Sequence, residues 1–140
     1  MKPLVYLMSL FILGSCLTSG CGKRVEGEPT YPVSGKVFFK GEPVAAGEIT
    51  FHPENPALSP DVGEIHDGAF QFAAKAGPVR VEIFASRPTG KMIDPPPGEV
   101  GESYPEVKNY IPAEYNTQSK LTETVTEDKS KNQFEFDLNE

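Results

Sequence analysis

The stretch YPVSGKVFFKGEPVAAGEITFH, residues 31–52, decides the fold of this chain. Apolar and polar side chains alternate along residues 31–39 and again along residues 47–52. Alternation with period two is typical of a β-strand that buries one face and exposes the other to water. Between the two runs, KGEP at residues 40–43 has the composition of a turn. The stretch therefore predicts two strands of an antiparallel sheet.

The same alternation recurs further along the chain, separated by turn residues. Asp67-Gly68 is the strongest hairpin signal, because a two-residue turn needs positive φ at both positions. No window has helical periodicity, and 14 Pro and 13 Gly work against helices. The pattern predicts an all-β, seven-stranded Greek-key β-sandwich of immunoglobulin-like architecture over residues 31–140. The other five expected strands are residues 62–66, 70–72, 79–85, 121–126 and 134–138.

The inward positions of these strands predict the core. They carry large apolar side chains, most of them aromatic, that two facing sheets would bury between them. The expected core residues are Phe39, Ile49, Phe51, Phe70, Phe72, Val81, Ile83, Phe134 and Phe136.

The first 20 residues have the composition of an export signal. Lys2 supplies a positive start, and residues 4–20 then run without a charge. A membrane-spanning anchor needs about 20 mostly apolar residues. This run is shorter and is interrupted by Ser, Gly and Thr, so a cleaved signal over residues 1–20 is favoured. The polar residues 22–30 that follow predict a flexible tether.

LTSGC, residues 17–21, resembles the lipobox of bacterial lipoproteins. The resemblance implies that the Cys21 thiol carries a lipid, with fatty acids such as palmitate, and that Cys21 becomes the first residue after cleavage. Two or more acyl chains anchor a protein durably, whereas one gives only marginal binding. LGSC, ending at Cys16, is a competing site. Cys21 is favoured because cleavage there leaves a fuller apolar run and a polar segment follows at once.

These features predict a protein of the bacterial cell envelope, held to a membrane by its lipid and facing the periplasm or exterior. The net charge of −7, without a basic stripe, argues against a nucleic-acid partner. With Cys21 acylated and Cys16 removed, no thiol is left for a disulfide or for catalysis. We expect no cofactor.

Residues 86–116 break the strand pattern, with six prolines and little alternation. They predict a long Pro-rich loop within the sandwich domain, and long loops in compact domains are usually functional or disordered. This loop is the expected interaction surface for an envelope protein or a glycan. Its exposed tyrosines are the expected contacts, although Tyr110 and Tyr115 are also expected to pack on the sandwich edge. The predicted surface residues are Tyr104, Tyr110 and Tyr115.

His52 and His66 are the only histidines. With nearby carboxylates they offer an alternative function, a metal-dependent binder or a hydrolase. Both fall on the polar face of their strands, and the expected hairpin register places His66 near Glu48 and His52 near Val62. That register keeps the histidines apart. A non-catalytic protein with a binding or structural role, and without a metal site, is therefore favoured.

The order of glycines and apolar residues resembles that of carboxypeptidase regulatory-like, or prealbumin-like, β-sandwich domains. The later segments DGAFQF, GPVRVEI and YIPAEYN are similar to those of small bacterial lipoproteins that carry one such domain. The resemblance implies the sandwich fold but no activity, because its motifs are turn glycines and core residues. The positions that carry it are Val33, Gly35, Val37, Gly41, Pro43, Val44, Gly47, Ile49 and Phe51.

Overall fold

The computed structural model describes residues 27–139. The predicted signal sequence, Cys16 and Cys21 lie outside these residues. Within them the chain forms ten strands and two short 3₁₀ turns, and no helix is long and apolar enough to cross a membrane. The strands are β1 (Thr30–Phe39), β2 (Glu42–Pro43), β3 (Ala46–Pro53), β4 (Asp61–His66), β5 (Ala69–Lys75), β6 (Gly77–Phe84), β7 (Ser86–Ile93), β8 (Tyr104–Asn109), β9 (Thr122–Val125) and β10 (Gln133–Leu138), and the 3₁₀ turns are η1 (Ala113–Tyr115) and η2 (Lys129–Lys131).

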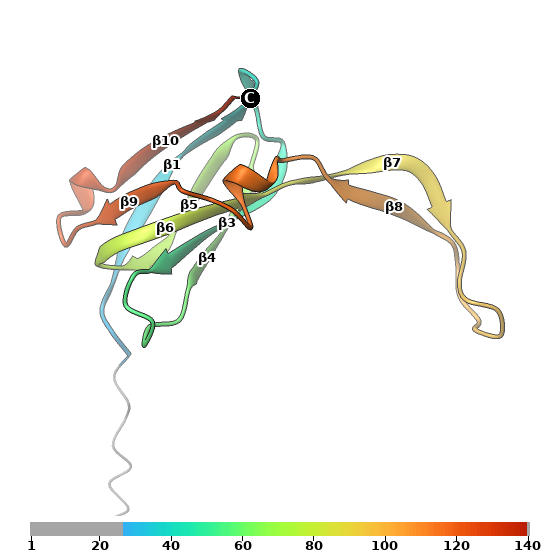
Figure 1. Ribbon diagram of the computed structural model, residues 1–140, viewed down its shortest axis with the longest axis horizontal. Helices are drawn as coiled ribbons and strands as arrows, with labels where there is room; N and C mark the ends of the chain where they lie inside the picture. The colour runs from blue at the N-terminus through green and yellow to red at the C-terminus, as the bar shows by residue number, and fades with distance from the viewer. Residues whose placement is uncertain (1–26, 140) are drawn as a thin grey trace, which may run out of the picture.

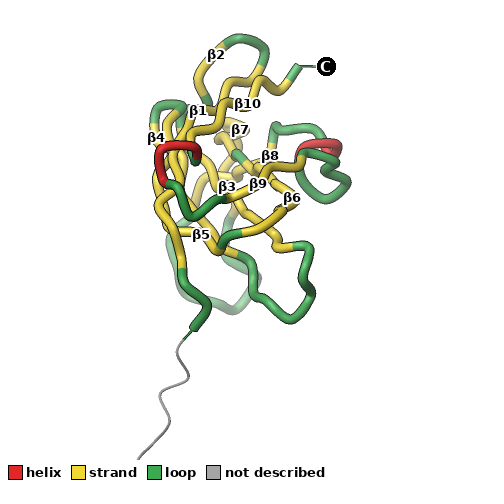
Figure 2. The backbone as a smooth tube through the Cα atoms, turned by 90° about the vertical axis from the view of Figure 1, so that its left-hand side faces the viewer, coloured by secondary structure: helices red, strands yellow, loops and turns green. Residues whose placement is uncertain are grey.

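Eight strands form one curled sheet with the order β10-β1-β5-β4-β3-β6-β9, and β2 pairs with β1. Within it, β6-β3-β4-β5 is the strand order of a Greek key. The curl brings β3, β6 and β9 opposite β10, β1 and β5, so the predicted all-β sandwich is confirmed (Figure 2). One pair departs from the expected antiparallel arrangement, because β1 and β10 run parallel.

All seven predicted strands are present as β1, β3, β4, β5, β6, β9 and β10. The count of seven was too low, because β2, β7 and β8 were not predicted. The prediction of one long loop over residues 86–116 is wrong. Part of that segment forms β7 and β8, which pair with each other in a separate two-stranded sheet. Its last residues form η1, and Tyr110 and Tyr115 pack against the core as expected.

Aromatic rings dominate the core, and Phe51 of β3 lies at their centre. Its ring meets Phe72 of β5 at 5.0 Å and Phe134 of β10 at 5.9 Å between ring centroids, both edge-to-face. Each buried side chain of this size contributes about 1.5–3 kcal/mol to folding. All nine predicted core residues belong to this core: six are buried, and Phe39, Phe72 and Phe134 are partly buried and packed against it.

Two strand glycines make room for these rings. A Cβ added at Gly63 of β4 would overlap the ring of Phe72, and one added at Gly35 of β1 would overlap Phe70 and a carbonyl of β10. Glycine normally weakens a strand, and it is tolerated here because the side chain from the neighbouring strand fills the space. The glycines of the sequence pattern are thus part of the core packing.

The two free edges of the curled sheet are joined by Asn132, which follows η2 and is 1% exposed. Its side chain accepts a hydrogen bond from the Thr126 N–H at 2.8 Å and donates one to the Thr126 carbonyl at 2.8 Å. It also donates to the carbonyl of Pro32 in β1 at 3.3 Å. Buried polar groups that lose such partners cost about 1–3 kcal/mol each. Asn132 therefore fixes how β9 approaches β1 and β10.

We predict that Gly63→Ala destabilises the protein by about 1–3 kcal/mol, because the new methyl group must displace the ring of Phe72. Chemical denaturation measures the change. Gly27→Ala is the matched control, since a Cβ there meets nothing within 4 Å. Adding Phe72→Leu to Gly63→Ala should recover part of the loss. A Gly63→Ala variant as stable as Gly27→Ala would contradict the packing described.

Candidate functional site

The β7–β8 ribbon projects from the sandwich as a separate two-stranded sheet (Figure 1). All residues of β7 are exposed, and in β8 only Glu106 is partly buried. A two-stranded hairpin alone is at best marginally stable in water. The ribbon thus contributes little to the core, and its side chains are presented to solvent.

One face of the ribbon is apolar. Pro88 of β7 lies opposite Val107 of β8, and Met92 lies opposite Pro105. Opposite residues share a face, and so do residues two apart on one strand, so all four side chains lie on one side. Met92 is 60% exposed and Val107 is 62% exposed. We call Pro88, Met92, Pro105 and Val107 the apolar ribbon face.

The prolines also determine how the ribbon can be contacted. Each ribbon strand has an unpaired edge, which is normally open to pairing with another strand. Pro88 in β7 and Pro105 in β8 have no N–H to offer. The ribbon is therefore suited to contact through its faces more than through its edges.

The base of the ribbon is fixed by Asn109 at the end of β8. Its side-chain oxygen accepts hydrogen bonds from the N–H groups of Ala85 at 3.2 Å and Ile111 at 3.3 Å, and its amide donates to the Ile111 carbonyl at 2.9 Å. The Tyr110 N–H donates to the Ala85 carbonyl at 2.9 Å. Ala85 and Ile111 are buried, so these bonds tie the ribbon to the core.

The three predicted surface tyrosines do not share one site. Tyr104 is 55% exposed and begins β8, at the end away from the sandwich (Figure 1). Tyr110 follows the other end of that strand, roughly 20 Å away at about 3.3 Å per residue. Tyr115 is partly buried, and its hydroxyl donates to the Asn139 carbonyl. Only Tyr104 is on the exposed part of the ribbon.

The two histidines lie far apart, but the predicted register is wrong. His66 lies opposite Ala46 instead of Glu48, and its Nε2 is 3.0 Å from the carboxylate of Glu64 on its own strand. His52 extends past β4 and lies opposite Arg80 of β6 instead of Val62. His52 lies six positions along β3 from Ala46, roughly 20 Å away. No group of three metal-ligating side chains occurs in residues 27–139.

His52 belongs to a small charged cluster with two residues of β6. Its Nε2 lies 3.1 Å from Oε2 of Glu82, an ion-pair distance for a protonated imidazole, without the geometry of a hydrogen bond. Arg80 donates a hydrogen bond to the other oxygen of Glu82. Burial raises the pKa of Glu82, but the Arg80 hydrogen bond and the charges of His52 and Arg80 outweigh it, and its pKa falls below the ordinary 4.5. The cluster is a structural ion-pair network on the outside of β3 and β6.

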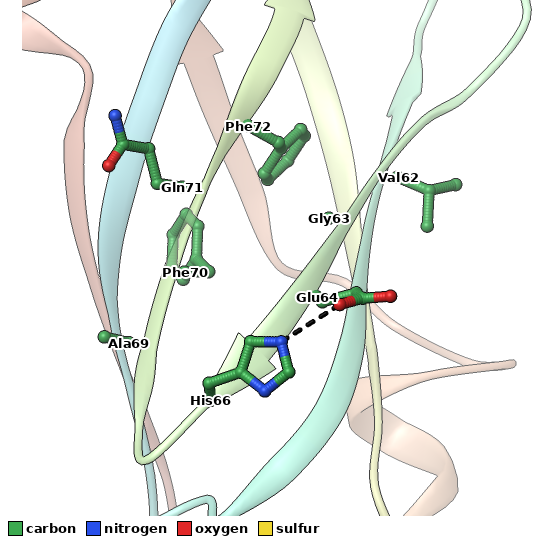
Figure 3. A pocket seen from close by; sticks show the side chains of 8 residues that line it. All are labelled: Val62, Gly63, Glu64, His66, Ala69, Phe70, Gln71 and Phe72. Carbon is green, nitrogen blue, oxygen red and sulfur yellow. Dashed lines mark hydrogen bonds and ion pairs between the residues drawn. The ribbon is translucent and has the colours of Figure 1, made fainter.

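A shallow groove opens where β4 and β5 separate (Figure 3). The two strands pair only next to their turn, at Ile65–Phe70 and His66–Ala69. They are joined again at the far end, where Lys75 Nζ lies 2.5 Å from Oδ1 of Asp61. The groove has a volume of about 530 Å³ and is lined by Val62, Gly63, Glu64, His66, Ala69, Phe70, Gln71 and Phe72.

The ring of Phe72 packs against Gly63 in this groove and fills the space beneath it. His66 and Glu64 lie together on one wall, joined by their hydrogen bond (Figure 3). Both side chains are mostly exposed. The groove therefore exposes one polar wall, made by Glu64 and His66, over an aromatic floor, and does not enclose a small molecule.

No family model, no curated protein and no solved structure matches the chain. The resemblance to carboxypeptidase regulatory-like domains and to lipoproteins stays a prediction. The candidate surfaces rest on the residues and geometry described above.

We predict that Glu82→Gln lowers the stability at pH 7 by about 1–2 kcal/mol, because it removes a charged partner of Arg80 and His52. A carboxyl whose folded-state pKa is lowered stabilises the fold above its ordinary pKa of 4.5, and the contribution is lost as the pH falls through the folded-state value. The difference from wild type should therefore shrink between pH 5 and pH 3. Urea unfolding across this range measures it. Glu54→Gln, at an exposed residue, is the control, and a difference independent of pH would refute the assignment.

Proposed function

We propose that this protein is a lipid-anchored, non-catalytic binding protein of the bacterial cell envelope, and that the β7–β8 ribbon is the element that meets its partner. The observation that carries the binding role is the apolar ribbon face. Exposed apolar patches on a soluble domain mark interaction sites when they are contiguous. Here four such side chains lie together on an element that contributes little to the core.

The energetics support a binding role for this face. Burying a side chain such as that of Met92 or Val107 against a partner contributes about 1.5–3 kcal/mol each to the free energy of binding. This contribution is absent while the side chains are exposed to water. Asn109 and Tyr110 hold the base of the ribbon in place, so less freedom is lost when a partner binds than with a flexible loop. A face that is held in place and apolar is suited to a protein or glycan partner.

The proposed anchor is Cys21, supported by the lipobox resemblance. Residues 22–29 would connect it to β1, and a chain of this length spans at most roughly 30 Å. Residues 27–29, the described part of this connection, are exposed. Such a tether would keep the sandwich near the bilayer while leaving the ribbon accessible to other envelope components.

We predict that Cys21→Ser abolishes incorporation of a fatty-acid analogue in growing cells, because the acylated thiol is gone. Gel fluorescence after coupling of a dye to the analogue measures the label. Cys16→Ser is the matched control and should keep full labelling. Label lost only in Cys16→Ser would move the anchor to that residue, and label retained in both variants would refute lipidation at either cysteine.

We predict that a photo-crosslinking amino acid at position 107, in intact cells, gives discrete adducts through the apolar ribbon face. The same amino acid at position 124, an exposed position on β9, is the control and should give none of these adducts. Adding Met92→Glu should reduce the adducts at position 107 severalfold, because a charge would be buried in the contact. Equal adducts at both positions, or none at position 107, would refute the binding role of the ribbon.

A further inference from the structure

The charged face of the ribbon has two cations side by side at its base. Arg87 of β7 lies directly opposite Lys108 of β8, so both side chains share the face away from the apolar ribbon face. Like charges in this position repel each other and destabilise a strand pair. Among residues 27–139, no carboxylate lies within ion-pair distance of either one. This is an uncompensated cation pair on a chain of net charge −7.

An aromatic side chain orients one of the two cations. The guanidinium of Arg87 lies 5.2 Å from the centroid of the Tyr110 ring. Tyr110 in turn packs against Phe39, with ring centroids 5.6 Å apart. A cation–π contact holds the guanidinium but uses none of its five N–H donors. Arg87 is therefore oriented and still able to bind a carboxylate through two parallel hydrogen bonds.

The nearest acids do not neutralise this pair. Glu106 lies on the same face, two residues before Lys108, and accepts a hydrogen bond from the Thr89 hydroxyl. Glu42 lines the same cleft as Arg87 but forms no ion pair with it. Both can accept hydrogen bonds from hydroxyl groups of a ligand.

Two adjoining clefts open at this base. One, of about 430 Å³, is lined by both cations. The other, of about 400 Å³, has apolar walls from Phe39 and Pro43. Arg87, Pro88 and Tyr110 line both. Volumes of this order are those of small-ligand sites, which combine apolar walls with a few polar groups that fix orientation.

We propose that the base of the ribbon is a binding site for a carboxylate-bearing sugar unit of an acidic polysaccharide. The inference rests on the proposed binding function of the ribbon and adds a ligand class for the charged face at its base. The carboxylate binds Arg87 and Lys108, the apolar side of the sugar ring lies against Phe39 and Pro43, and Glu42 accepts hydrogen bonds from the hydroxyls. An anionic lipid surface fits less well, because the ribbon loop carries Asp94, Glu99 and Glu102 and would be repelled.

The test uses the full chain in detergent and isothermal titration calorimetry. The probe is tetragalacturonate at 50 mM NaCl, and its fully methyl-esterified form is the neutral control. We expect the acid to bind at least tenfold more tightly than the ester. Arg87→Gln should weaken binding of the acid at least tenfold, and Lys108→Gln about three- to tenfold. Arg87→Lys should not restore full affinity, because lysine lacks the planar fork.

Lys91→Gln is the matched control, because it removes the same charge elsewhere on β7 and should leave binding within twofold. Lys108→Gln should melt at or above the wild-type temperature, which shows that the variant is folded and that the repulsion was real. Raising NaCl to 300 mM should weaken binding of the acid.

Four results would overturn the site: equal binding of the acid and the ester, equal loss in Lys91→Gln, no binding at millimolar probe, or binding only to phosphatidylcholine vesicles that contain phosphatidylglycerol. The crosslinked adducts at position 107 distinguish a failure of the sugar site from a failure of the ribbon's binding role. If they persist while the sugar does not bind, the site at the base of the ribbon is wrong but the binding role of the apolar ribbon face stands. If they are absent, the binding role of the ribbon fails regardless of the titration.

Discussion

The edge-to-face packing of Phe51 against rings from the opposite half of the sandwich is the contact on which the architecture depends. Phe51 is fully buried and lies within 5.0–6.5 Å, between ring centroids, of Phe70, Phe72 and Phe134. Rings this large between two sheets leave no space for side chains directly beneath them. Gly35 and Gly63 meet that constraint. β4 and β5 separate next to Gly63, because the ring of Phe72 occupies the space in which the two strands would otherwise pair.

The ribbon is a consequence of how β6 leaves this core. A single buried residue, Ala85, separates β6 from β7, so the chain continues outward almost without a turn. The return strand enters the sandwich at Ile111, and Asn109 bonds to both Ala85 and Ile111. The ribbon therefore extends from a fixed base, although neither of its strands pairs with the main sheet.

Much of the fold could be predicted from the sequence because burial on one face leaves a period-two pattern. β7 and β8 left no such pattern, since both of their faces are exposed and Pro88 and Pro105 resemble loop residues. The predicted partner of His66 was wrong by two positions along β3. Alternation determines which face a residue occupies but not which residue lies opposite it. The opposition of Arg87 and Lys108 follows from register as well. Neither cation stands out in the sequence, and the pair exists only once β7 and β8 are aligned.

The overall charge explains how such a pair can persist. Two cations at adjacent positions repel, but the negative potential of a chain with net charge −7 offsets part of that cost. The same potential opposes the approach of any anion. A ligand must therefore gain from the oriented guanidinium of Arg87 and from apolar contact with Phe39 as well as from charge. These requirements favour a compact carboxylate attached to a ring, and they disfavour a polyanion that offers charge alone.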